Sequence, residues 1–279
     1  TCNARYMDEV ERVLYNNVLT GVSLSGDKYT YQNPLNTDKP DRWEWHVCPC
    51  CPPMFLKIMA AMPGYIYAYQ GDNVYVNLFI GSEVRVPVGK SNSVRLKQLT
   101  SYPWHGAVSI QVNPDKASTF SMKVRIPGWA QGTENPYDLY QSNLKAPVKL
   151  KVNQEDVLLR IVDGYAEINR EWKKGDHIEL ELPMQPRLIT ANKAVENLRG
   201  QVALASGPII YCFEDADNPE LQTFKLQAQT PLELSHDSNL LNGVNIIKCQ
   251  GDIPAKAIPY YAVANREESH SYKVWIPQK

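Results

Sequence analysis

The chain has 279 residues, of which 43% are hydrophobic and 21% are charged, and its formal net charge is −1. This length leaves room for about two domains, and the composition is that of an ordinary globular protein. The balanced charge predicts neither nucleic acid nor an anionic membrane surface as a partner. No apolar run approaches the roughly 18 residues that a membrane-spanning helix needs.

The first 66 residues are predicted to be mainly helical. Residues 1–20 carry apolar side chains at helical spacing, and Gly21 is typical of the position after a helix end. A second helix is expected from Pro52, because prolines in a first turn remove no helical hydrogen bond, and Pro63-Gly64 ends it. The apolar stripe predicted for the first helix consists of Met7, Val10, Leu14 and Val18.

After Gly64 the apolar residues alternate with polar ones, and the runs are separated by turn signals. This pattern predicts an antiparallel β-sandwich over residues 67–183 and a second one over residues 184–270. The last run fits either sandwich by its pattern, and we assign residues 271–279 to the first. The predicted fold is therefore mainly β: two antiparallel β-sandwich domains preceded by a helical stub, residues 1–66.

Six cysteines in a chain of this length are too few for a disulfide scaffold. Cys212 and Cys249 lie in or directly after apolar runs, so we expect them to be buried and inert. Three others fall within the string Cys48-Pro49-Cys50-Cys51-Pro52-Pro53. Neighbouring cysteines rarely have the geometry of a disulfide, so this cluster predicts a metal site or a reactive-thiol site. Cys50 and Cys51 would lie at a helix N-terminus, whose partial positive charge favours thiolate.

Several strings along the chain match one known family in order. They are Thr1-Cys2, Glu11-Arg12-Val13-Leu14-Tyr15-Asn16, Tyr31-Gln32-Asn33-Pro34-Leu35, the cysteine string, Arg125-Ile126-Pro127-Gly128-Trp129-Ala130, Gly207-Pro208 with Tyr211, and Pro259-Tyr260-Tyr261-Ala262 with Ala264-Asn265-Arg266-Glu267. On these strings the chain resembles the C-terminal part of glycoside hydrolase family 127, whose characterised members are retaining β-L-arabinofuranosidases. The resemblance implies the end of an (α/α)6 catalytic barrel over residues 1–66, followed by two β-sandwiches.

The resemblance also implies a zinc site and a set of roles. Cys2, Cys50 and Cys51 would be thiolate ligands of Zn²⁺, and Cys50 would also be the nucleophile. The fourth ligand, a Glu of a Glu-Thr-Cys string, and the acid/base Glu would both lie upstream of Thr1. Tyr31 would face the sugar. Met54 stands where the family pattern has Asn, which leaves the ligands unchanged but alters the expected pocket.

Nearby residues have simpler interpretations. We expect Cys48 to be a buried small residue rather than a ligand, and His46 to belong to the loop or to support a ligand. Trp104, Trp129 and Trp172 could suggest a platform on which sugars stack, but a sandwich of this size needs buried aromatic residues, so we assign them to its core.

Two readings of the whole chain follow. In the first it is a piece of a retaining glycoside hydrolase that acts on L-arabinofuranosides, and the 279 residues alone are inactive because both carboxylates are missing. In the second it is a non-catalytic, carbohydrate-binding or accessory β-sandwich protein with a structural zinc-thiolate site. A thiol redox protein is disfavoured, because the chain shows no βαβ pattern around its cysteines. A homodimer and either a cytoplasmic or a periplasmic location stay open.

Overall fold

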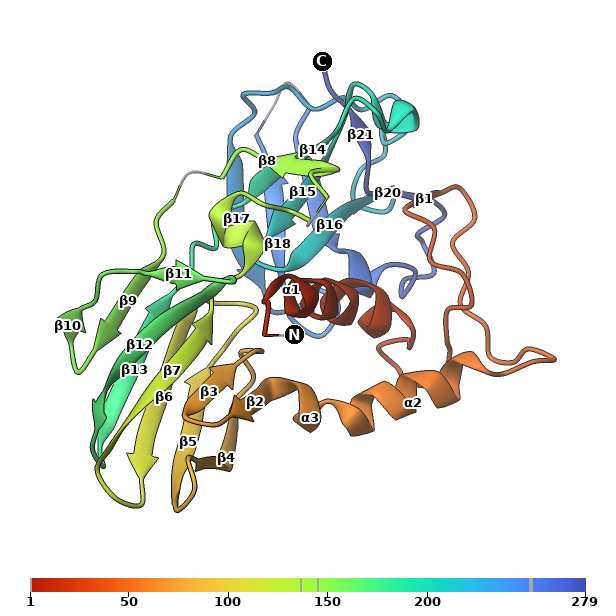
Figure 1. The fold of residues 1–279 in the computed structure, drawn as a ribbon. Helices are drawn as coiled ribbons and strands as arrows, with labels where there is room; N and C mark the ends of the chain where they lie inside the picture. The colour runs from red at the N-terminus through yellow and green to blue at the C-terminus, as the bar shows by residue number, and fades with distance from the viewer. Residues whose placement is uncertain (1, 136, 145, 251–252) are drawn as a thin grey trace. The chain divides into compact units, whose positions relative to one another are not determined.

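The structure, a computed structural model, describes residues 2–135, 137–144, 146–250 and 253–279. It divides into two compact units, both mainly β (Figure 1). The first unit consists of Thr1–Glu9, Ala60–Gln131 and Lys145–Met184, and the second of Val10–Met59, Gly132–Leu144 and Gln185–Lys279. The stub of residues 1–66 therefore contributes to both units. No helix in the described part of the chain is long and apolar enough to cross a membrane.

The N-terminal helix changes type along its length. The helix α1 (Arg5–Arg12) continues into a π-helix, η1 (Val13–Val18), and two further helices follow at α2 (Cys51–Ala61) and α3 (Pro63–Ile66). Leu14 is buried as predicted, but Tyr15 and Asn16, outside the predicted stripe, are buried beside it. Asn16 can be buried because its Nδ2 donates to Pro208 O at 2.9 Å and its Oδ1 accepts from Ile210 N at 2.7 Å.

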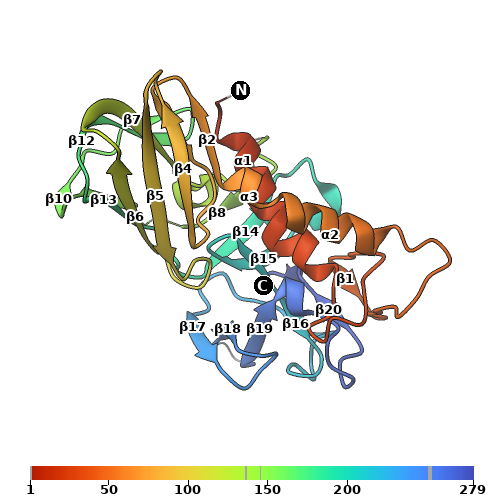
Figure 2. The same ribbon diagram turned by 90° about the horizontal axis from the view of Figure 1, so that it is seen from below.

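The first unit contains two sheets. One has the order β11-β12-β7-β3-β2 and the other β10-β9-β13-β6-β5-β4, and Figure 2 shows β4, β5 and β6 side by side. Neighbouring strands are antiparallel except β3 and β7, which are parallel. This pair departs from the predicted pattern because the chain builds β4 to β6 in the other sheet between them, and parallel pairs need such a crossover. The bounds are β2 (Tyr67–Gln70), β3 (Asn73–Val76), β4 (Ser82–Val88), β5 (Asn92–Thr100), β6 (Ala107–Pro114), β7 (Ser118–Arg125), β9 (Lys149–Val152), β10 (Glu155–Asp156), β11 (Ile161–Val162), β12 (Tyr165–Trp172) and β13 (Asp176–Glu181).

The six-stranded sheet of the first unit buries alternate side chains along its longer strands. On β5 the buried positions are Val94, Leu96 and Gln98, and the expected period of two is therefore present. Trp172 is fully buried and its Nε1 donates to Phe120 O at 3.1 Å. Trp129 is buried as well, so both tryptophans belong to the core, as predicted.

The second unit is built on one large sheet. Its main order is β17-β18-β19-β16-β15-β14-β8; β20 pairs with β1 and β16, and β21 pairs with β15. Figure 1 shows β14, β15 and β16 side by side. The bounds are β1 (Asn36–Thr37), β8 (Tyr140–Ser142), β14 (Arg187–Ala191), β15 (Gln201–Ser206), β16 (Ile209–Glu214), β17 (Leu232–Asp237), β18 (Val244–Cys249), β19 (Ala255–Pro259), β20 (Tyr272–Lys273) and β21 (Ile276–Pro277).

The last strands belong to the second unit, so the assignment of residues 271–279 to the first sandwich is corrected. Phe213 and Glu214 of β16 pair with β20, and Val202 of β15 pairs with β21. The reason is packing: Val274 and Trp275 are buried in the core of the second unit. The apolar run at the end of the chain could not distinguish the two sandwiches by pattern alone.

A partly buried charged network joins β16 and β19 of the second unit to the segment before β20. Arg266 pairs with Glu214 at 2.5 Å and with Asp217 at 2.7 Å, and Lys256 pairs with Asp217 at 2.5 Å. Burial alone would raise the pKa of Asp217, but hydrogen bonds from Arg266 and Lys256 outweigh it and hold the pKa below its usual value. The ionised carboxylate therefore stabilises the folded chain.

We expect Asp217→Asn to lower the free energy of unfolding at neutral pH by about 2 kcal/mol, because two charge-assisted hydrogen bonds are weakened. A depressed carboxyl pKa contributes stability above the pKa of the unfolded chain, and this contribution is lost as pH falls through the lower, folded value. Urea unfolding between neutral and acidic pH measures this. The difference between wild type and variant should shrink toward low pH, and a constant difference would contradict the assignment.

Candidate functional site

The cysteine cluster lies at the N-terminus of α2. Cys51 is the first residue of the helix, Cys50 precedes it, and Met54 N donates to Cys50 O at 3.3 Å. The Sγ atoms of Cys50 and Cys51 are 4.0 Å apart. Cys50 is exposed and Cys51 is half-buried, so the pair can be reached from outside this chain. The positive end of the helix stabilises negative charge on these sulfur atoms.

The loop before α2 is held by aromatic stacking. Tyr29 and Trp43 exchange backbone hydrogen bonds of 2.9 and 2.8 Å. The rings of Tyr31 and His46 are stacked with centroids 4.7 Å apart, and His46 stacks on Trp43 at the same separation. Cys48 N donates to His46 Nδ1 at 3.2 Å. His46 thus ties the aromatic stack to the cysteine string, which is the loop role expected for it.

Cys2 is presented by the sheet edge of the first unit. Its Sγ donates to Gln70 Oε1 at 3.2 Å. Ala4, two residues further along, fixes this segment to the rest of the first unit. Its N–H donates to Asp163 O at 2.8 Å, and its side chain packs in a small cluster with Tyr75 and Tyr165. Burial, then a hydrogen bond with Cys2 and the charge on Cys2, raise the pKa of Tyr75. A tyrosine hydroxyl therefore accompanies this thiol.

The predicted site residues fall into two groups. Cys50, Cys51 and Tyr31 lie in the second unit, and Cys2 lies in the first. Neither unit by itself gathers three His, Cys, Asp or Glu side chains that could hold a metal ion among its described residues. Cys48 is exposed, so the prediction that it is buried is wrong, because the proline-rich string leaves it on an open turn.

Sequence reasoning missed two residues of this cluster, Tyr29 and Trp43. Both stand between polar neighbours, so no apolar run marks either of them. The sequence does show several aromatic residues close together between positions 29 and 46. Such spacing is found in sugar-binding sites but also in many ordinary folded loops, so by itself it does not identify a site.

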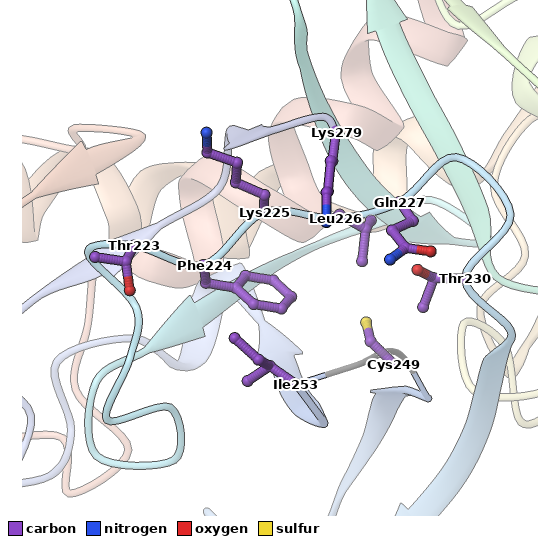
Figure 3. A pocket seen from close by; sticks show the side chains of 9 residues that line it. All are labelled: Thr223, Phe224, Lys225, Leu226, Gln227, Thr230, Cys249, Ile253 and Lys279. Carbon is purple, nitrogen blue, oxygen red and sulfur yellow. The ribbon is translucent and has the colours of Figure 1, made fainter.

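The remaining cysteines are inert. Cys212 and Cys249 are buried, as predicted, and burial raises the pKa of Cys249 to about 12. Cys249 lines a cavity of about 310 Å³ with Phe224, Leu226 and Ile253 (Figure 3). The other lining residues are polar or charged, namely Thr223, Lys225, Gln227, Thr230 and Lys279. Among these described residues Cys249 has no second sulfur beside it, unlike the cysteines at α2.

Three family models match the chain in order. Residues 1–64 match the model described as "Beta-L-arabinofuranosidase, GH127 catalytic domain", residues 73–184 the "GH127 middle domain", and residues 186–277 the "Glycoside hydrolase family 127 C-terminal domain". Together these matches leave out only short segments of the chain.

Named relatives agree with these models. The chain is 29% identical to a non-reducing end β-L-arabinofuranosidase of Bifidobacterium longum subsp. longum, covering 94% of this chain and 44% of the relative. A solved GH127 β-arabinofuranosidase is 35% identical with a TM-score of 0.91, covering 99% of this chain and 46% of that one. A GH127 β-L-arabinofuranosidase from Geobacillus stearothermophilus T6 is 33% identical with a TM-score of 0.90, covering 100% and 47%. The chain thus spans less than half the length of these relatives.

The docking of the segment that carries Cys2 can be tested at Gly164. This glycine has φ +82°, and a Cβ placed on it would lie 2.5 Å from Ala4 Cβ. Gly175 has φ +95° and open space around a Cβ, so Gly175→Ala is the matched control. We expect Gly175→Ala to lower the free energy of unfolding by about 1 kcal/mol through backbone strain, and Gly164→Ala to lower it by about 2–3 kcal/mol because overpacking is added.

Urea unfolding gives the two losses of stability, and hydrogen exchange of residues 2–8 reports on the docked segment. Only Gly164→Ala should accelerate that exchange. Equal effects of both variants would mean that Ala4 is not held against the turn at Gly164.

Proposed function

The chain belongs to glycoside hydrolase family 127, and from this premise we propose that it is part of a retaining glycosidase that releases L-arabinofuranose units, with Cys50 as nucleophile. The observation that carries the proposal is the pair of sulfur atoms at the start of α2, 4.0 Å apart. The activity belongs to the complete protein, because this chain spans 44% of the curated relative.

The donor set fits a zinc ion. In a tetrahedral site with Zn–S distances of about 2.3 Å, two sulfur ligands lie about 3.8 Å apart. The 4.0 Å between Cys50 and Cys51 therefore suits two thiolates that share one ion. Cys2 would supply a third sulfur, and a Glu outside these 279 residues would be the fourth ligand. When bound, the ion would keep the thiols ionised and fixed in position.

The chemistry then follows from the position of Cys50. Its exposed thiolate attacks C1 of the sugar, forming a C–S bond while the C1–O bond breaks. A carboxylic acid outside these residues gives its proton to the leaving oxygen. Water that is deprotonated by the same carboxylate then attacks C1, and the C–S bond breaks to restore the thiolate. Two displacements at C1 give net retention.

Tyr31 would contact the sugar. Its side chain is 41% exposed, and its ring is held by the stack with Trp43 and His46. A ring fixed on one face and open on its edge can donate a hydrogen bond without losing much conformational entropy on binding.

The exposed apolar surface of α2 is consistent with a catalytic domain that is larger than residues 1–66. α2 is apolar in composition, yet none of its residues is buried by the described part of the chain, and Met54 and Leu56 are among its exposed side chains. Such a surface is expected when neighbouring helices are needed to complete a bundle.

The zinc site predicts the metal content of the full-length protein. We expect one zinc per chain by mass spectrometry of the purified protein, and loss or strong weakening in Cys50→Ala and in Cys51→Ala, because each removes one of four ligands. Cys48→Ala is the matched control in the same string and should retain zinc. A zinc-free wild type would exclude both the proposed thiolate chemistry and the structural zinc-thiolate site of the accessory reading.

We further expect the isolated 279-residue chain not to hydrolyse an aryl β-L-arabinofuranoside, since the proposed acid/base carboxylate would lie outside it. The full-length protein should be active, and Cys50→Ser should lower kcat by about 10³-fold or more, because the nucleophile is replaced by a weak one. Turnover by the isolated chain that disappears in Cys50→Ser would show that the required acid lies within these residues.

A further inference from the structure

Arg42 carries a buried positive charge that is held by carbonyl oxygens of the main chain. The residue directly precedes Trp43 of the aromatic stack and is 9% exposed. Its Nη1 donates to Thr20 O at 2.9 Å, and its Nε and Nη2 donate to Val263 O at 3.1 and 2.9 Å. Taking a charge out of water is costly, so these contacts with two distant segments of the chain call for an explanation.

The two carbonyl groups belong to segments that only the fold brings together. Thr20 lies two residues after η1, whereas Val263 follows a short 3-10 helix, η4 (Tyr260–Ala262). A guanidinium presents five N–H donors in a rigid planar fork, so one arginine can hold two carbonyl groups at a fixed separation. The ammonium of a lysine is a single flexible donor group and does not impose such a separation. The shape of the Arg42 side chain therefore matters here as much as its charge.

The turn that presents Val263 O is itself constrained. Ala264 has φ +56°, a conformation that residues with a Cβ seldom adopt. Its N–H donates to Glu214 Oε1 at 2.8 Å, and Asn265 Nδ2 donates to Val263 O at 3.1 Å. Backbone strain of this kind persists only where surrounding contacts hold it. Val263 O is therefore a fixed anchor for Arg42.

Trp43 carries this anchoring from Arg42 to the aromatic stack. Its ring lies nearly parallel to that of Tyr31, with centroids 5.1 Å apart and an interplanar angle of 8°. His46 stacks on both rings and accepts a hydrogen bond from Cys48 N. The contacts of Arg42 thus hold the residue whose ring supports Tyr31 beside the cysteine string.

We propose that Arg42 is a positioning residue of the proposed site, which holds Trp43, and through it the ring of Tyr31, against the turn at Val263 and Ala264. This rests on the proposed function, because it requires that Tyr31 contacts the sugar. The anchoring turn belongs to residues 186–277, which match the C-terminal domain model. That domain thereby shapes the sugar site through the loop that it holds.

The test uses the full-length protein, its steady-state kinetics on an aryl β-L-arabinofuranoside and its near-ultraviolet circular dichroism. Arg42→Lys keeps the charge but not the fork. We expect KM to rise about 10-fold, which corresponds to one weakened hydrogen bond to the sugar, while kcat stays within about 2-fold. The part of the dichroism that is lost in Trp43→Leu comes from the stacked indole, and it should also weaken in Arg42→Lys.

A double-mutant cycle separates positioning through Trp43 from a general loss of stability. If Arg42 acts through this ring, Arg42→Lys raises KM no further once Trp43→Leu is present. Asn265→Ala is a second variant, which keeps the test decisive if Arg42→Lys does not fold. It removes a donor to Val263 O and the acceptor of Leu24 N, 2.8 Å away, so it should raise KM in the same direction.

The matched control is Arg187→Lys, which breaks the fork of another buried arginine of the second unit. Arg187 donates to Glu134 Oε1 at 2.6 Å and to Gly207 O at 2.8 Å. This variant should lose stability but keep the KM and the dichroism of the wild type. An equal rise in KM in both lysine variants would contradict the proposal.

Two further outcomes are distinguishable. If the wild type is active and Arg42→Lys leaves KM and the dichroism unchanged, or if its effect on KM multiplies that of Trp43→Leu, the inference is wrong while the proposed function stands. If the wild type does not hydrolyse the arabinofuranoside, the proposed function fails and this inference fails with it.

Discussion

The buried side-chain amide of Asn16 is the contact that seats the helical segment on the sheet of the second unit. Its Nδ2 donates to Arg12 O and Pro208 O, and its Oδ1 accepts from Ile210 N. Each bond contributes about 1 kcal/mol, but a buried group left without its partner costs about 1–3 kcal/mol. The segment that leads to the loop with the aromatic stack begins where this helix ends.

Other buried polar contacts also join segments that lie far apart in the sequence. Arg42 donates to Thr20 O and Val263 O, and so joins the loop to the segment after β19. In the first unit the fully buried Arg125 pairs with Asp8 at 2.6 Å. Asn16 and Arg125 lie in strings by which the family is recognised. Each supplies a polar group whose partner lies far away in the sequence, so that neither partner can change alone without leaving a buried donor or acceptor unpaired.

Periodicity and turn signals in the sequence predicted a mainly β chain, the start of α2 at the cysteine pair and the burial of Cys212 and Cys249. These features depend on local spacing. The parallel pairing of β3 with β7, the assignment of the last strands to the second unit and the burial of Asn16 depend on which distant segments meet. Local pattern cannot distinguish such choices, because an alternating strand fits any sheet with an apolar face. The same limit hid the role of Arg42, whose carbonyl partners are visible only once the fold is known.

The π-helix at Val13–Val18 has a consequence for how this segment can vary. A π-turn holds more residues than an α-turn, which is the geometry produced when one residue is inserted into an existing helix. Removing a single residue here would restore regular α geometry, but it would rotate Asn16 by about 100° about the helix axis. The amide would then leave Pro208 and Ile210 and point elsewhere. The segment should therefore accept exchanges of its exposed side chains far more readily than any change in its length.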